Sequence, residues 1–315
     1  FPPLKGQVVD VDSFPPDSLT FDKEEIKVFP KRPWLAAGEV VAFNVGVWAF
    51  DRYVLDGSYA YISLKSMKRN LKHGFYWDND NLQTNLFNHP YHGSLYHNAA
   101  RSNGMNYWQS GLFTLGGSLM WELLMECELP ATNDLIMTAV GGSAMGEVLF
   151  RSSDLVFDNR LQGGKRFGHE VLGTILSPGR GLTRLLTGEA WKVSPASGRH
   201  FHSPKLEFSL AVGIKALELR NLNEDNLGYG VGLGFDGRMR YGSLFEDSNE
   251  PFSYFDAHID INIQKGQPLL GQLNIMGRLT SKMIYEDKHN QLVLGAFHHF
   301  DYYDSDTLAK SQKIS

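Results

Sequence analysis

Residues 89–104, HPYHGSLYHNAARSNG, concentrate side chains that could do chemistry. Three histidines, His89, His92 and His97, occur within nine residues, and Arg101 follows them. An imidazole can act as a general base or a metal ligand, and a guanidinium can hold a phosphate or a carboxylate. The segment is therefore a catalytic or metal cluster, a polar seam inside a helical core, or a histidine-rich loop.

Carboxylates with helical spacing follow this segment in two apolar stretches. Glu122 and Glu126 lie four apart in YWQSGLFTLGGSLMWELLMECEL, and Glu147 and Arg151 lie four apart in TNDLIMTAVGGSAMGEVLFRSSDLV. Residues four apart share one face of a helix. Burying a charge without a partner is expensive, so in a packed bundle these groups must pair, coordinate something or face water.

The functional interpretation is a pocket in which His89 or His92 is the base or ligand and Glu122 or Glu126 is the acid or ligand. These four are the predicted catalytic residues. The predicted ligand-binding residues are Tyr96, Arg101, Asn133, Asp134, Glu147 and Arg151. HxxH with ExxxE offers donors that suit a divalent metal, but the spacing matches no zinc signature and HExxH is absent. We therefore predict neither a metal nor a cofactor.

The structural interpretation of the same residues is a buried network that fixes the packing of the helices. Its expected contacts are the ion pairs Glu147–Arg151 and Arg101–Glu122, with Asn133 and Asp134 as a helix cap. This interpretation is favoured for the cluster as a whole.

The composition excludes several classes of protein. The chain has 315 residues, of which 42% are apolar and 21% charged, and a net charge of −5. A disordered chain is excluded, and no Lys/Arg block indicates nucleic-acid binding. No uninterrupted run of about 18 apolar residues occurs, so we expect no transmembrane helix. The beginning FPPLKGQ fits a mature form that has lost a signal peptide.

The chain is expected to fall into four parts. Residues 1–34 repeat proline and predict an extended strap, and residues 35–160 are mainly helical. Residues 161–202 are expected to be linker and loops, and residues 203–315 antiparallel strands. In the helix that carries Glu147, the glycines at 142 and 146 form a small-residue face that lets another backbone approach closely.

The period of the apolar residues changes to two from about residue 203. FDAHIDINIQ, for example, alternates apolar residues with Asp256, His258 and Asp260. Five such segments predict an antiparallel meander. Their length of 10–15 residues and the aromatics near their ends favour part of an outer-membrane β-barrel over a soluble sheet. Because five strands cannot close a barrel, we expect either a fragment or strands hidden in residues 1–200. The fold class is thus α+β, a helical segment followed by a meander.

The block from His89 to Asp154 resembles a bacterial domain of unknown function, family 3943. The family pattern reads roughly H-P-x-H-G-x-x-Y, A-R-x-N-G, G-S-x-x-W-E, N-D and G-E-x-x-x-R. The matching residues are His89, Pro90, His92, Gly93, Tyr96, Arg101, Gly104, Gly117, Ser118, Trp121, Glu122, Asn133, Asp134, Gly146, Glu147 and Arg151. The resemblance covers about residues 85–155. It implies a secreted Gram-negative protein whose C-terminal half is a barrel, and it implies no activity.

We therefore expect an outer-membrane or envelope protein of unknown ligand, with a transport, scaffold or envelope-maintenance role and membrane lipid as its partner. The enzyme alternative is a membrane-embedded hydrolase or acyl transferase that acts on lipid or lipopolysaccharide. In it, His89 or His92 is the base, Glu122 orients that base, and Arg101 or Arg151 holds a phosphate or carboxylate. A third alternative is a soluble periplasmic binding protein. No nucleic-acid partner is expected.

Overall fold

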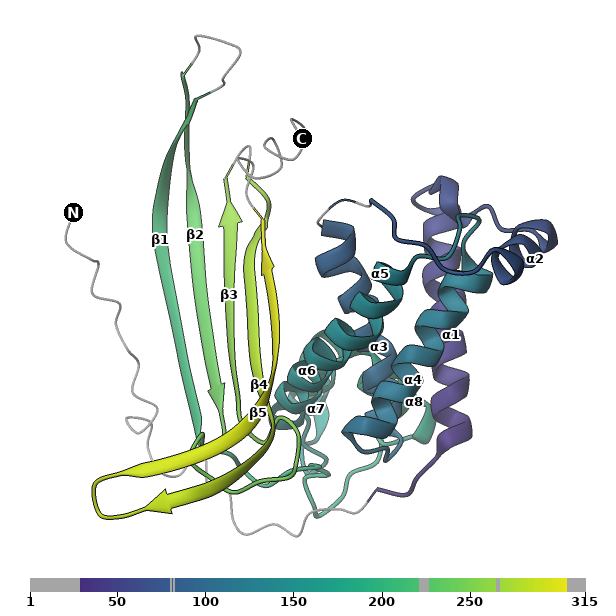
Figure 1. Cartoon of the computed structure of the whole chain (residues 1–315). Helices are drawn as coiled ribbons and strands as arrows, with labels where there is room; N and C mark the ends of the chain where they lie inside the picture. Colours follow the sequence, from purple (N-terminus) through teal and green to yellow (C-terminus); the bar gives the residue numbers. More distant parts are fainter. Residues whose placement is uncertain (1–28, 80, 82, 221–226, 265–266, 305–315) are drawn as a thin grey trace. The chain divides into compact units, whose positions relative to one another are not determined.

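The computed structural model describes residues 29–79, 81, 83–220, 227–264 and 267–304. The chain divides into two compact units (Figure 1). Among the described residues, the helical unit runs from Phe29 to Ser203, and the sheet unit runs from Pro204 to Asp304. Residues 1–28 of the predicted strap lie outside the described residues.

The helical N-terminal part of the predicted fold is confirmed. Its α-helices are α1 (Pro33–Tyr53), α2 (Leu64–His73), α3 (His89–Ser102), α4 (Tyr107–Met120), α5 (Thr132–Ile136), α6 (Gly142–Val156), α7 (Gly163–Leu176) and α8 (Pro178–Thr187). A short 3-10 turn, η3 (Ser58–Ala60), and three π-helical turns, η4 (Thr84–Asn88), η5 (Trp121–Met125) and η6 (Met137–Gly141), connect or extend them.

Residues 161–202, for which we expected linker and loops, instead contain α7 and α8. Helix α8 has ordinary boundary signals, because it begins at Pro178 and is followed by Gly188 in the left-handed conformation. However, it buries Arg180 and Arg184 and leaves Leu185 exposed. Helix α8 therefore lacks the apolar face toward the core by which a helix is recognised in a sequence, and for this reason it was not predicted.

Helix α3 is the centre of the helical unit and packs against α1, α4, α6 and α8. Its residues from 92 to 100 are all buried. Where α3 crosses η6 and α6, a Cβ added to Gly93 would collide with the backbone carbonyl of Thr138, and one on Gly142 would lie 2.6 Å from the Cα of Gly93. A Cβ on Gly146 would lie 2.8 Å from the Cβ of His97. The predicted close approach along the 142/146 face is therefore confirmed.

The interior of the helical unit is largely polar. Among the described residues, Ala36, Ala100 and Met105 form one compact apolar group, and Val40, Tyr96 and Ala99 form another. Helix α1 shows the same arrangement, since it buries Glu39, Asn44 and Asp51 and exposes much of its apolar surface. By length and composition alone α1 is apolar enough to cross a membrane, although no such helix was expected.

The described residues of the sheet unit form one antiparallel sheet, and the predicted meander is confirmed. Its strands are β1 (Leu206–Arg220), β2 (Leu227–Tyr241), β3 (Phe255–Ile263), β4 (Leu270–Glu286) and β5 (Gln291–Tyr303). They pair in sequence order, β1-β2-β3-β4-β5, so β1 and β5 are the edges and the sheet is open (Figure 1).

The crossing of α3 over α6 gives a direct test of the packing. We expect Gly93→Ala to lower the free energy of unfolding of the full chain by about 1–3 kcal/mol, because the backbones would have to separate. The matched control is Gly116→Ala in α4, where an added Cβ meets no atom within 4 Å. Alanine there should stabilise by about 0.5–1 kcal/mol. Equal effects of the two substitutions in equilibrium denaturation would contradict the crossing.

Candidate functional site

Among the described residues of the helical unit, three clusters of ionisable side chains lie largely buried. The acidic cluster contains His89, Glu122, Glu126 and Asp134. The Glu147 cluster contains His97, Arg101, Glu147 and Arg151. The Asp154 cluster contains Asp154, Arg180 and His200, and Glu170 with Arg184 lies beside it. Helix α3 supplies His89 to the first cluster and His97 and Arg101 to the second.

The acidic cluster joins three segments of the chain. His89 begins α3, Glu122 lies in η5 and Asp134 lies in α5. The Nε2 atom of His89 is 3.3 Å from Oδ2 of Asp134. One potential ligand atom each from His89, Glu122 and Asp134 lie within 4.8 Å of one another. The structure therefore brings together one predicted histidine and two predicted carboxylates.

Glu122 and Glu126 are neighbouring carboxyls within this cluster and share a hydrogen bond. Oε2 of Glu122 accepts the backbone N–H of Ala131 at 2.8 Å. Burial raises the pKa of Glu122 to about 7, against the lowering effects of the Ala131 N–H and of His89. Burial also raises the pKa of Glu126 well above its ordinary value, and the neighbouring Glu122 and Asp134 raise it further. Two close carboxyls in a dry site share a proton more readily than they both ionise.

His92 does not join His89 in this cluster. Its Nε2 is 2.7 Å from the hydroxyl of Tyr96, which donates to Oδ1 of Asn44 at 2.9 Å. Its ring also stacks edge-on against Trp121. Burial lowers the pKa of His92 to about 3, so its imidazole is neutral. His92 and Tyr96 thus belong to a hydrogen-bonded chain between α3 and α1.

The Glu147 cluster is closed by reciprocal ion pairs. Oε1 of Glu147 is 2.9 Å from Nε of Arg151, and its Oε2 is 2.8 Å from Nε of Arg101 and 3.1 Å from Nε2 of His97. Burial alone would raise the pKa of Glu147, but Arg101, the His97 hydrogen bond and Arg151 together hold it far below its ordinary value.

Two of the contacts expected for a structural network are wrong. Arg101 pairs with Glu147 rather than with Glu122, because it lies twelve residues beyond His89 along α3, a rise of about 18 Å. Asn133 and Asp134 do not cap α5, which begins without a side-chain cap. Asp134 contacts His89 instead, and the amide of Asn133 donates to Asp78 and Asn85.

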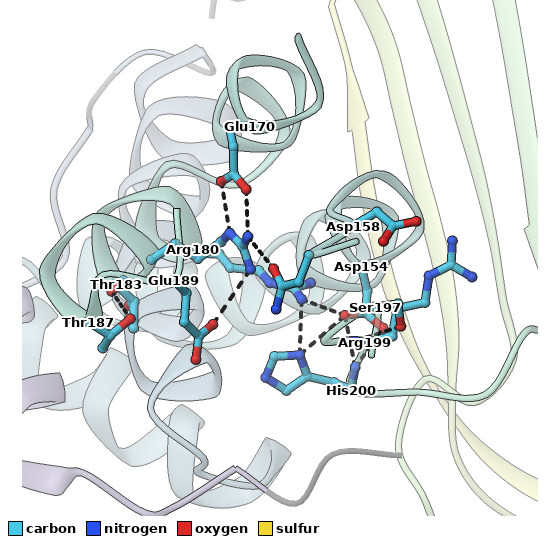
Figure 2. A network of polar contacts seen from close by, with 12 residues as sticks. Asp154, Asp158, Glu170, Arg180, Thr183, Thr187, Glu189, Ser197, Arg199 and His200 are labelled. Atoms are coloured by element: carbon cyan, nitrogen blue, oxygen red, sulfur yellow. Dashed lines mark hydrogen bonds and ion pairs between the residues drawn. The ribbon is translucent and has the colours of Figure 1, made fainter. Parts of the chain in front are cut away.

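The Asp154 cluster was not predicted (Figure 2). Asp154 is 2.6 Å from the Arg180 guanidinium and accepts the backbone N–H of His200 at 3.0 Å. Burial and Arg180 lower the pKa of His200 to about 4, although Asp154 opposes them. Beside it, Arg184 is 2.6 Å from Glu170. The available signal was the spacing of Arg180 and Arg184, four apart like Glu147 and Arg151.

Glu39 of α1 is a second buried acid that the sequence did not single out. Its Oε2 accepts the hydroxyl of Thr183 at 2.7 Å and the amide of Asn103 at 3.0 Å. Burial raises the pKa of Glu39 to about 7, and the two hydrogen bonds oppose this only in part. The signal was a lone acid in the mostly apolar stretch GEVVAFNVGVWAF.

One segment of the chain, which contains most of these residues, matches a known family model. Residues 74–179 match the family model described as domain of unknown function DUF3943. The chain contains a DUF3943 domain. That domain holds all the residues of the acidic and Glu147 clusters and Asp154, whereas Glu39, Arg180, His200 and the sheet lie outside it. Comparisons with curated proteins and with solved structures found no match.

The DUF3943 domain brings together only part of the predicted site. Arg101 and Arg151 are both engaged by Glu147, so neither is free to hold a phosphate or carboxylate of a substrate. His89, Glu122, Glu126 and Asp134 do converge, and this cluster is the candidate for binding or acid–base chemistry.

The raised pKa of Glu39 predicts a pH dependence of stability. A carboxyl whose folded pKa of about 7 exceeds its unfolded value of about 4.5 contributes most below pH 4.5, and this contribution is lost as the pH rises through 7. The difference between pKa values corresponds to roughly 3 kcal/mol. We expect Glu39→Gln to remove this dependence, so that the variant gains on wild type between about pH 5 and pH 8.

The measurement is the free energy of unfolding of the full chain across this pH range. The matched control is Glu286→Gln, the same substitution at an exposed position, and it should not produce this gain over wild type. Parallel curves for wild type and Glu39→Gln would show that the carboxyl titrates normally.

Proposed function

We propose that this chain is an envelope membrane protein whose sheet unit contributes strands to an outer-membrane β-barrel. The helical unit then serves as a scaffold, or as part of a transport path, for a ligand that is still unidentified. The observation that carries the proposal is the contrast between the two faces of the sheet. The partner of the apolar face is membrane lipid.

One face of the sheet carries apolar side chains that its own unit leaves exposed. Ile214 is 76% exposed and Val231 is 72% exposed, and Val212 pairs with Phe235 across β1 and β2. A soluble antiparallel sheet normally buries its apolar face against other elements. A membrane barrel directs that face to lipid and alternates it with a polar face toward the lumen.

The opposite face is held by cross-strand polar contacts. The Lys215 ammonium lies 2.7 Å from the Asp260 carboxylate, and Asp256 pairs with Arg238 at 2.6 Å and with Arg240 at 2.9 Å. Such a face suits water and would be costly in hydrocarbon. Strands β1, β2, β4 and β5 also have 13–17 residues, longer than the roughly 9–11 that a tilted strand needs to span a membrane.

The helical unit adds a second apolar surface. Its interior is polar, while large apolar side chains lie on its exterior. Those on α1, α4 and α7 are Trp34, Val41, Val45, Phe50, Tyr53, Trp108, Leu112, Leu115, Phe167, Val171, Leu172 and Ile175. Exposed apolar surface on this scale marks a site of interaction with protein or membrane. It supports a protein that works next to lipid.

The enzyme alternative finds less support. It required Arg101 or Arg151 to hold a phosphate or carboxylate, and both arginines are committed to Glu147. The periplasmic alternative would require protein rather than lipid to cover the apolar face of the sheet.

Lipid contact can be measured on β1 with two matched labels. In a Cys127→Ser background, we would place a fluorophore on Val212→Cys, which lies on the apolar face, and on Ser209→Cys, which is exposed on the polar face. The full chain is then reconstituted in vesicles. We expect brominated lipid to quench the label at 212, and aqueous iodide to quench the label at 209, because strand neighbours of opposite parity face opposite sides.

Equal quenching by iodide at both positions would contradict lipid contact and favour a water-exposed sheet. Protection of position 212 from both quenchers would favour the periplasmic alternative, in which protein covers the apolar face.

A further inference from the structure

The acidic cluster differs from the other two clusters in its balance of charge. Glu147 faces two arginines and a histidine, and Asp154 faces Arg180 and His200. The acidic cluster contains three carboxyls and one imidazole. Within the described part of the chain, no lysine or arginine forms an ion pair with Glu122, Glu126 or Asp134. Buried carboxylates without a cationic partner are a costly arrangement unless a proton or a cation supplies the missing positive charge.

The geometry of the cluster fits a bound ion. Nε2 of His89 and Oδ2 of Asp134 are 3.3 Å apart. Two ligands at about 2.0–2.2 Å from a tetrahedral ion lie about 3.3–3.6 Å from one another. Glu122 is fully buried, and its Oε1 accepts no N–H from the residues that the structure describes. That oxygen belongs to a side chain whose ligand atom lies within 4.8 Å of those of His89 and Asp134.

Neighbouring residues hold the potential ligands in place. Nδ1 of His89 lies 3.2 Å from the hydroxyl of Thr138, and its Nε2 lies 3.3 Å from Oδ2 of Asp134. The Ala131 N–H fixes Oε2 of Glu122, and the Asn133 amide fixes Oδ1 of Asp134 at 3.0 Å. Metal-binding histidines and carboxylates are commonly oriented by such outer hydrogen bonds.

Each ligand also lies in or beside a π-helical turn. Turn η4 ends immediately before His89, η5 contains Glu122, and η6 begins three residues after Asp134. Wide helical turns of this kind often occur at functional sites. Here they accompany all three segments that meet at the cluster.

We propose that His89, Glu122 and Asp134 bind a divalent transition-metal ion, and Glu126 lies next to Glu122 at the edge of this site. One imidazole with carboxylates is a donor set that suits zinc, manganese or iron rather than calcium or magnesium. The ion would join α3, η5 and α5 within the DUF3943 domain. This site goes beyond the proposed envelope function and does not depend on it. No zinc signature in the sequence predicts it, because Asp134 approaches only through the fold.

The experiment titrates Co²⁺, followed by competing Zn²⁺, into the metal-free full chain in detergent. We expect one ion per chain, with an absorption spectrum typical of coordinated cobalt. Glu122→Gln keeps the acceptor for the Ala131 N–H and should weaken binding by about 100-fold or more, since even outer-sphere changes cost 10–100-fold. The matched control is Glu39→Gln, the same substitution at a buried acid outside the site, and it should bind as wild type does.

Asp134→Asn is the second variant in the binding titration. Independently of any variant, X-ray absorption of the zinc-loaded wild-type chain identifies the ligand atoms around the ion. The expected shell contains one imidazole nitrogen and otherwise oxygen. The proposal is overturned if the wild-type chain binds no ion, if Glu122→Gln and Asp134→Asn both bind as tightly as wild type, or if the shell contains two or more imidazoles. The last result would place the ion at another group of histidines.

Discussion

The cost of burying charge governs the helical unit. Helix α3 passes through the centre of that unit with buried polar side chains along most of its length, so the neighbouring helices must supply hydrogen-bond or ion-pair partners for them. Helix α6 supplies Glu147, which forms ion pairs with Arg101, Arg151 and His97. Removing one member of such a buried group typically costs more than the intact group contributes, because an uncompensated charge remains. Helix packing and charge pairing are therefore inseparable here.

This constraint also explains the exterior. A helix that directs its polar residues inward has only its apolar residues left for the outside, and α1, α7 and α8 all follow that arrangement. The sheet also leaves apolar side chains exposed. Its ion pairs lie on one face, and its exposed apolar side chains lie on the other. Both units thus present apolar surface that an aqueous environment would penalise.

Local contacts were predictable from the sequence and distant ones were not. Glu147–Arg151 follows from helical spacing, and the strands follow from alternation along β1 to β5. By contrast, the partner of Arg101 lies 46 residues away and that of Glu39 lies 144 residues away. Helices α7 and α8 were not predicted because buried arginines interrupt the helical period of their apolar residues. His89 and Glu122 were singled out by residue type, but only the fold shows that Asp134 completes their cluster while His92 does not.

The central claim is that the buried carboxyls with arginine partners, Glu147 and Asp154, are ionised. The carboxyls of the acidic cluster have no arginine or lysine partner among the described residues, and in the absence of a bound cation they hold a proton. Infrared spectroscopy of the chelator-treated full chain at neutral pH measures this directly, because a protonated carboxylic acid absorbs apart from a carboxylate. The account predicts a buried carboxylic-acid band that decreases in Glu126→Gln and persists in the control Glu286→Gln, at an exposed position. An unchanged band in Glu126→Gln, or no such band in the wild-type chain, would contradict it.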